Sequence, residues 1–156
     1  MLLINFCLPR NNVLKWQKGV INMVKEIQFQ RSKQRIFAMD ENYNVIGDWE
    51  CRDDFVQGYN EAGDPRGSLP DGVYTNVSAE VTNGAYGAAY GTFYITTHDP
   101  RARDIHGGGS GLPNPFAGRQ GWVPTYGCLR MQNIDGEELS RMIIAAGNNV
   151  VLTVVP

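Results

Sequence analysis

The sequence predicts one domain of mainly β structure, a β-sandwich or barrel with one α-helix near the C-terminus and one long loop. Three observations lead to this fold class. The chain has 156 residues, a length that suits a single hydrophobic core. Its 18 glycines accompany frequent turn-forming pairs. Short stretches in which apolar and polar residues alternate recur along most of its length.

The first part of the chain reads differently from the rest. We interpret residues 1–24 as an N-terminal extension and residues 25–156 as the domain. The extension has a short apolar run, but no basic region precedes it and no small-residue cleavage site follows it, so it is not typical of a secretory signal. We hypothesise that Met23 is the true start and that residues 1–22 are not native.

The strands are predicted from alternation and from the turns that separate them. A hairpin is expected where the turn "ENYN" joins two alternating stretches, and "LPDG" is a turn with proline at its second position. A long segment without a pattern of its own is uncommon in a compact domain unless it is functional. We therefore expect strands at 25–30, 34–40, 45–51, 73–81, 89–97 and 149–155, and loops at 53–68 and 98–127.

One helix is predicted between the long loop and the last strand. Asp135 is the expected N-cap, with Glu138 in capping-box position three residues later. Gly147 suits the position after the helix end. One apolar face is formed by Leu139, Met142, Ile143 and Ala146.

Composition excludes several classes of function. The net charge of −2 gives no electrostatic footprint for nucleic acid, and no apolar run reaches membrane-spanning length. The three cysteines, Cys7, Cys51 and Cys128, form neither a disulfide framework nor a metal-binding pair. We expect a monomer with no nucleic-acid partner and no membrane span.

The chemistry is expected at the two ends of the long loop, where His106 and Cys128 lie. A cysteine becomes a nucleophile when a base can take its proton and its surroundings favour the thiolate. His106 is the candidate base. Gly127 lets backbone amides approach a substrate carbonyl and form an oxyanion hole, and Arg130 adds a charge that favours the thiolate or binds a carboxylate.

Other interpretations of these residues stay open. A lone cysteine is often buried and structural, and a lone histidine is often exposed. His98 is a second candidate base, and His98, His106 and Cys128 have ligand types that suit zinc, although not a recognised zinc spacing. "HGGG" lacks the serine elbow of esterases, and "GGGSG" lacks the ending of a phosphate loop. Tyr86, Tyr90 and Tyr94 are interpreted as strand packing, with a binding groove as the alternative.

The residues around the two ends of the loop resemble a known signature. "IHGG" followed by "TYGCLRM" is similar to the motif of L,D-transpeptidases of the YkuD type, and the resemblance covers about residues 25–156, including "LPDGVY". Two features depart from that motif: Tyr126 stands where the family has histidine, and the spacer from 107 to 124 is long. Some related peptidoglycan-attacking toxins vary at that position. The matching residues are His106, Gly107, Thr125, Gly127, Cys128, Leu129 and Arg130.

The resemblance implies a YkuD-like catalytic domain and a mechanism without a cofactor or metal. Cys128 would attack a peptidoglycan stem peptide and form a thioester, with His106 as base and the carbonyl of Gly107 orienting its ring. Tyr126, Gly127 and Cys128 would line the oxyanion site. Thr125, Tyr126 and Arg130 would bind substrate.

The same resemblance implies a periplasmic or extracellular site of action, although the sequence shows no convincing signal peptide. The acceptor stays open between an amine, water and a D-amino acid. The alternative is a catalytically inactive module of the same fold that binds cell-wall peptides.

Overall fold

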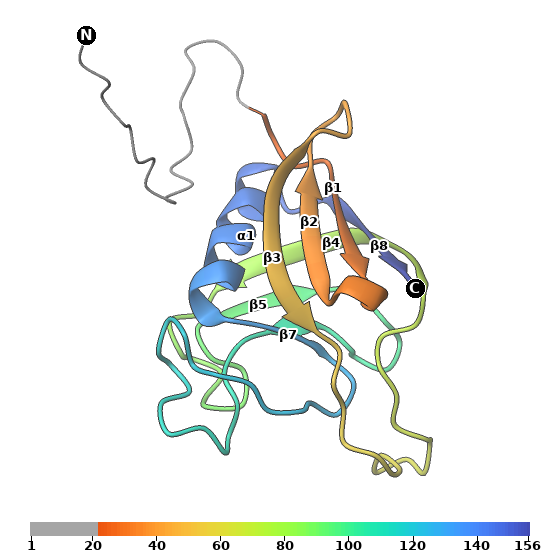
Figure 1. The fold of residues 1–156 in the computed structure, drawn as a ribbon, viewed down its shortest axis with the longest axis vertical. Coiled ribbons are helices and arrows are strands. Elements are labelled where there is room, and N and C mark those ends of the chain that lie inside the picture. The colour runs from red at the N-terminus through yellow and green to blue at the C-terminus, as the bar shows by residue number, and fades with distance from the viewer. Residues whose placement is uncertain (1–21) are drawn as a thin grey trace, which may run out of the picture.

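The computed structural model describes residues 22–156, which form a closed eight-stranded barrel with one helix packed beside it (Figure 1). The predicted extension and the start hypothesis concern residues that lie, up to residue 21, outside the described residues. The elements are β1 (Glu26–Gln30), η1 (Arg31–Lys33), β2 (Arg35–Met39), β3 (Val45–Arg52), β4 (Gly72–Val81), β5 (Phe93–Thr96), β6 (Ile105–His106), β7 (Leu129–Met131), α1 (Asn133–Ala145) and β8 (Val150–Val155).

The strands follow the order β1-β2-β3-β7-β6-β5-β4-β8, and pairing between β8 and β1 closes the barrel. Most neighbours are antiparallel, whereas β8 with β1 and β6 with β7 are parallel. Closure pairs the two outermost strands with each other, which removes the free edges that promote aggregation. The predicted mainly β fold with one helix is confirmed.

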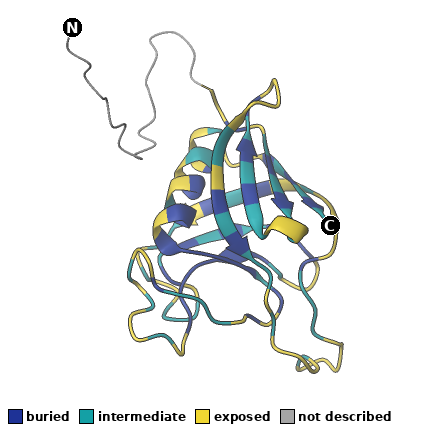
Figure 2. Cartoon of the chain, viewed as in Figure 1, coloured by how far each residue is buried: buried dark blue, intermediate teal, exposed yellow. Residues whose placement is uncertain are grey.

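The barrel interior is apolar because β1, β2 and β8 bury every second side chain (Figure 2). The helix adds Leu139 and Ile143, both wholly buried, and packs against β4 and β5. This matches the alternation that predicted the strands. The buried residues of the three strands are Ile27, Phe29, Ile36, Ala38, Val150, Leu152 and Val154.

The predicted cap of the helix is wrong. The helix begins at Asn133, so Asp135 lies inside its first turn, where it accepts a hydrogen bond from Arg119 Nη2 at 2.9 Å. Glu138 does not cap the helix: its carboxylate accepts a hydrogen bond from the indole N–H of Trp49, in β3, at 3.1 Å. The backbone amide of Asn133, which has no partner within the helix, donates to Gln120 Oε1 at 2.7 Å. A side chain from the long loop therefore caps the helix, a contact that local sequence cannot indicate.

The loops 53–71 and 107–128 both lie at one end of the barrel, which is the lower end in Figure 1. Backbone hydrogen bonds join them: Val56 N donates to Thr125 O at 2.8 Å, and Leu69 N donates to Gly127 O at 3.1 Å. The segment predicted as one loop over 98–127 contains β6. The strand predicted at 89–97 begins only at Phe93, because turns occupy the residues before it.

Arg31 fixes both ends of the loop 53–71. Its guanidinium pairs with Asp53 at the start of the loop and with Asp71 at its end, the latter at 2.9 Å. It also donates to the carbonyl of Leu69 at 2.8 Å. Within residues 22–156 no helix has the length and apolar character needed to cross a membrane.

Candidate active site

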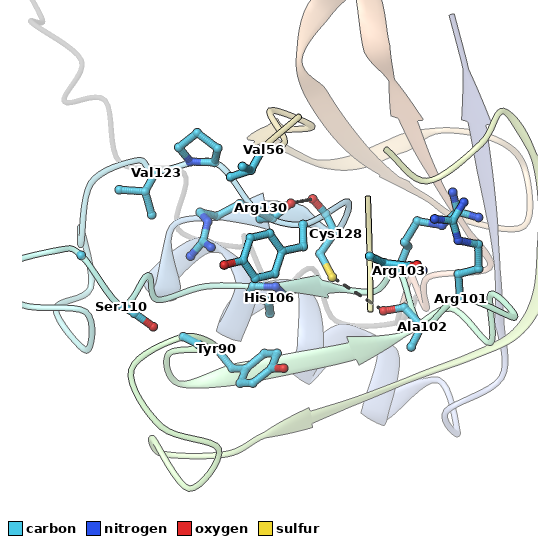
Figure 3. A pocket seen from close by; sticks show the side chains of 16 residues that line it. Val56, Tyr90, Arg101, Ala102, Arg103, His106, Ser110, Val123, Cys128 and Arg130 are labelled. Carbon is cyan, nitrogen blue, oxygen red and sulfur yellow. Dashed lines mark hydrogen bonds between the residues drawn. The ribbon is translucent and has the colours of Figure 1, made fainter. Parts of the chain in front are cut away.

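The parallel pairing of β6 with β7 brings the two ends of the long loop together. Ile105 is opposite Leu129 and His106 is opposite Arg130. Cys128 directly precedes β7, so the barrel holds it next to the strand that carries His106. Both side chains line one pocket of about 490 Å³, shown in Figure 3.

His106 is buried and held in one orientation. Its Nδ1 lies 2.9 Å from the carbonyl oxygen of Gly107, which assigns the ring proton to Nδ1 and leaves the lone pair on Nε2. The ring of Tyr94 stacks parallel to it at 6.2 Å, and the ring of Tyr90 meets it edge-on at 5.0 Å. Burial, together with the charge of Arg130, lowers the pKa of His106 to about 4, so the imidazole is neutral at pH 7 and can accept a proton.

Cys128 is half-buried, with its sulfur 3.7 Å from the carbonyl oxygen of Ala102. Burial raises the pKa of the Cys128 thiol above its ordinary value, and the Asp104 carboxylate adds to the rise. The resting pair is therefore a neutral thiol beside a neutral imidazole. Such a pair forms its nucleophile by passing the thiol proton to the imidazole as the attack occurs.

Arg130 is a buried cation beneath the start of the loop. Only 4% of its surface is exposed, and Nη1 donates to the carbonyl of Gly107 at 2.7 Å and to the carbonyl of Gly108. No carboxylate pairs with it among residues 22–156, and its Nε has no hydrogen-bond partner there. Burial lowers the pKa of Arg130, yet a guanidinium stays charged at neutral pH.

The residues just before Cys128 form a tight turn. Gly127 has φ +136°, and a Cβ there would lie 2.5 Å from the carbonyl oxygen of Gly67, so only glycine fits. The amide of Gly127 donates to Thr125 Oγ1 at 3.0 Å, and that hydroxyl donates to the carbonyl of Cys128 at 2.7 Å. The Gly127 amide is thus occupied within the turn.

Tyr126 is 71% exposed at the pocket rim, in the position where the resembling motif has histidine. The guanidinium of Arg66 lies over its ring at 4.0 Å. The side chain of Tyr126 is therefore held from the loop 53–71.

Asn133 is a positioning residue that sequence reasoning missed. It is 1% exposed and ties the loop to the helix start. Its Oδ1 accepts from the amides of Thr92 at 3.2 Å and Gly108 at 3.3 Å, and its Nδ2 donates to the carbonyls of Pro115 at 2.9 Å and Ala117 at 2.7 Å. In the sequence it is marked only by its place two residues after the end of β7.

Two glutamines support the same loop. Gln120 Nε2 donates to the carbonyl of Met131 at 2.8 Å. Gln132 exchanges two hydrogen bonds with the backbone of Gly121, at 3.0 and 3.2 Å. The segment between His106 and Cys128 is therefore anchored to β7 and α1 along its length.

The alternative residues lie elsewhere. His98 is outside the pocket lining, and its Nε2 lies 3.1 Å from the carbonyl oxygen of Asn76. Within residues 22–156, His98, His106 and Cys128 belong to no group of three or more side chains that could hold a metal ion. The interpretation of the three tyrosines as strand packing is wrong for Tyr86 and Tyr90, which lie in turns, and only Tyr94 of the three lies in a strand. Tyr90 lines the pocket.

Several solved structures of L,D-transpeptidases are similar in fold to this chain. An L,D-transpeptidase from Stackebrandtia nassauensis superposes with a TM-score of 0.56 at 14% identity, covering 91% of this chain and 62% of that one. The chain has the L,D-transpeptidase fold. An L,D-transpeptidase from Xylanimonas cellulosilytica gives a TM-score of 0.52 at 12% identity, covering 88% and 63%. One from Enterococcus faecium gives 0.51 at 13% identity, covering 85% and 50%.

This chain spans less than two thirds of the length of those structures with the L,D-transpeptidase fold. No sequence-family model and no curated protein sequence matches it. The likeness is thus one of fold at low sequence identity.

Proposed function

We propose that this chain is a cysteine-dependent acyltransferase of the L,D-transpeptidase type that acts on peptidoglycan stem peptides. The observation that carries the proposal is the pairing of β6 with β7, which puts a neutral, oriented imidazole and a thiol into one pocket within this fold. In this proposal Cys128 is the nucleophile and His106 is the general base, and the chemistry needs neither a cofactor nor a metal.

The proposed first half-reaction forms a thioester. The sulfur of Cys128 attacks the carbonyl carbon at the L-centre of diaminopimelate, while Nε2 of His106 takes the thiol proton. The amides of Tyr126 and Cys128 stabilise the oxyanion. The tetrahedral intermediate then collapses, the carbon–nitrogen bond breaks, and the leaving D-alanine amine receives the proton from the imidazolium.

In the second half-reaction an acceptor amine, or water, attacks the thioester carbonyl and gives its proton to His106. The Cys128 sulfur leaves and takes that proton back, so both residues return to their starting state. Gly107 contributes through its carbonyl, which holds the Nδ1 proton of the imidazole throughout. Thr125 holds the turn that carries Cys128, and Arg130 binds a carboxylate of the stem. Because this substrate is part of the cell wall, the proposed site of action is periplasmic or extracellular.

The test is mass spectrometry of muropeptides after incubation with the purified protein under reducing conditions. We expect loss of D-alanine from tetrapeptides, with new cross-links, hydrolysed stems or exchanged D-amino acids identifying the acceptor. Cys128→Ala and His106→Ala should reduce the rate by at least about a thousandfold, because neither half-reaction proceeds without the pair.

The chain offers a matched control for each variant. Cys51→Ala removes a thiol that is buried in β3 and outside the pocket lining, and His98→Ala removes the other histidine. Both should keep the wild-type rate. If the wild type forms no product from any stem peptide but binds stems saturably, the enzymatic function is rejected. The alternative, an inactive module that binds cell-wall peptides, would then be favoured.

A further inference from the structure

The wall of the pocket has an excess of positive charge. Its lining includes Arg101, Arg103 and Arg130 but neither aspartate nor glutamate. The whole chain carries 16 acidic and 14 basic side chains, so this bias is local and does not follow from composition. A pocket lined by one sign of charge concentrates ligands of the opposite sign. The ligand is therefore expected to be an anion.

The charges lie on both sides of the nucleophile. In Figure 3 the sulfur of Cys128 lies between Arg130 on one side and Arg101 and Arg103 on the other. The second group belongs to the segment just before β6, whose Ala102 carbonyl lies 3.7 Å from the sulfur. A substrate that presents its acyl carbon to Cys128 therefore extends toward a guanidinium in both directions.

The two arginines before β6 differ in how they are neutralised. Arg103 forms a two-point pair with Asp99, with Nε to Oδ2 at 2.8 Å and Nη2 to Oδ1 at 3.0 Å. Arg101 is exposed, donates to the carbonyl of Pro65 at 2.6 Å, and pairs with no carboxylate among the residues that the structure describes. Its charge is the one left for a ligand on that side.

We propose that Arg101 forms a second carboxylate subsite opposite Arg130, so that the pocket selects acyl donors with a free carboxylate on each side of the bond that breaks. This inference rests on the proposed function. In a tetrapeptide stem the leaving D-alanine carries one carboxylate, and the D-centre of diaminopimelate carries another on the acyl side. Stems in which either group is a carboxamide are poorer substrates.

The experiment uses four synthetic tetrapeptides, in which each of the two carboxylates is either free or a carboxamide. Release of the leaving group is followed for the wild type, Arg101→Gln and Arg35→Gln. Arg35 is a matched control because it lies in β2, pairs with Asp48 at 2.6 Å and makes the same charge change away from the pocket.

We expect each carboxamide to lower kcat/KM of the wild type by about 5- to 10-fold, mainly through KM, because a charge pair remote from the bond that breaks contributes to binding more than to chemistry. Arg101→Gln should remove the preference at one of the two carboxylates and keep it at the other. Arg35→Gln should keep both preferences. The preference that depends on Arg101 should shrink as salt rises from 50 to 500 mM, since salt screens exposed charges.

A uniform loss in Arg101→Gln, equal for acids and carboxamides, would assign Arg101 a structural role and overturn the inference. Equal use of all four peptides by the wild type would also overturn it while leaving the proposed function standing. Turnover of none of the four would instead count against the proposed function. Arg101→Glu is the second variant: it should invert the preference at the same carboxylate, a result that simple loosening of the loop does not produce.

Discussion

The barrel wall of β1, β2 and β8 and the loop 107–128 are held in place by different kinds of contact. In the wall, alternate apolar side chains are buried and strand pairing is continuous. In the loop, the contacts are hydrogen bonds from a few buried polar side chains, Gln120, Gln132 and Asn133. The wall therefore spreads its stability over many residues, whereas the loop 107–128 depends on a few buried polar side chains.

The largest effect on stability is expected from breaking the wall. Phe29 is wholly buried in β1, and Phe29→Ala should lower the free energy of unfolding by about 3–5 kcal/mol, because it removes a large apolar side chain and leaves a cavity. Urea unfolding measures the loss. Phe116→Ala, at a phenylalanine that is 46% exposed, is the matched control and should change stability by less than about 1 kcal/mol. Equal losses in the two variants would show that burial in the barrel wall is not what stabilises the fold.

The second effect concerns His106, which is buried in β6 at the start of the loop 107–128. The pKa of His106 is lowered from 6.5 to about 4 in the folded protein. Between these values the unfolded chain binds a proton that the native site does not, so stability falls as pH drops. Acidification from pH 7 to pH 4 should remove on the order of 3 kcal/mol through this group.

The measurement is urea unfolding at pH 7, 5.5 and 4 for the wild type and His106→Gln. The difference in stability between them should shift in favour of the variant as pH falls, since the variant has no proton to exclude. A difference that stays constant over this range would mean that His106 titrates alike in both states. Activity, in contrast, should persist down to about pH 5, where the imidazole is still neutral.

The third prediction breaks an anchor of the loop. Asn133→Ala removes four hydrogen bonds to backbone groups of the loop and the turn before β5, and should cost about 2 kcal/mol of stability. The loss of turnover should be larger than this cost implies, because the loop carries the carbonyl that orients His106. Hydrogen exchange should show faster exchange at the amide of Gly108 while the amides of β1 stay protected.

Asn133→Asp keeps an acceptor for the two amides but turns a buried carboxylate oxygen toward the carbonyls of Pro115 and Ala117, so at neutral pH it should be at least as damaging as Asn133→Ala in both readouts. If both variants speed exchange equally across the whole barrel, the loop and the wall unfold as a single cooperative unit. The two regions would then not be stabilised separately.

The same contrast explains how much the sequence could predict. The wall and the positions of His106 and Cys128 follow from local signals, namely alternation, turn residues and a recognisable motif. The helix cap does not, because the acceptor is Gln120, thirteen positions earlier in the chain. The role of Asn133 and the charge left on Arg101 depend on which distant backbone and carboxylate groups lie nearby, and no spacing in the sequence encodes these contacts.

The smallest expected effect concerns the residue that departs from the resembling motif. Tyr126 is exposed and contacts Arg66 through its ring, so Tyr126→His loses only a surface cation–π contact of about 0.5 kcal/mol. Stability should hardly change in urea unfolding, and turnover should change by less than about 3-fold, because the proposed oxyanion contact uses the backbone amide. A gain or loss of tenfold or more would mean that the side chain at 126 contacts the substrate. The difference between this chain and the motif would then be one of substrate recognition, carried by the rim of the loop and independent of the wall.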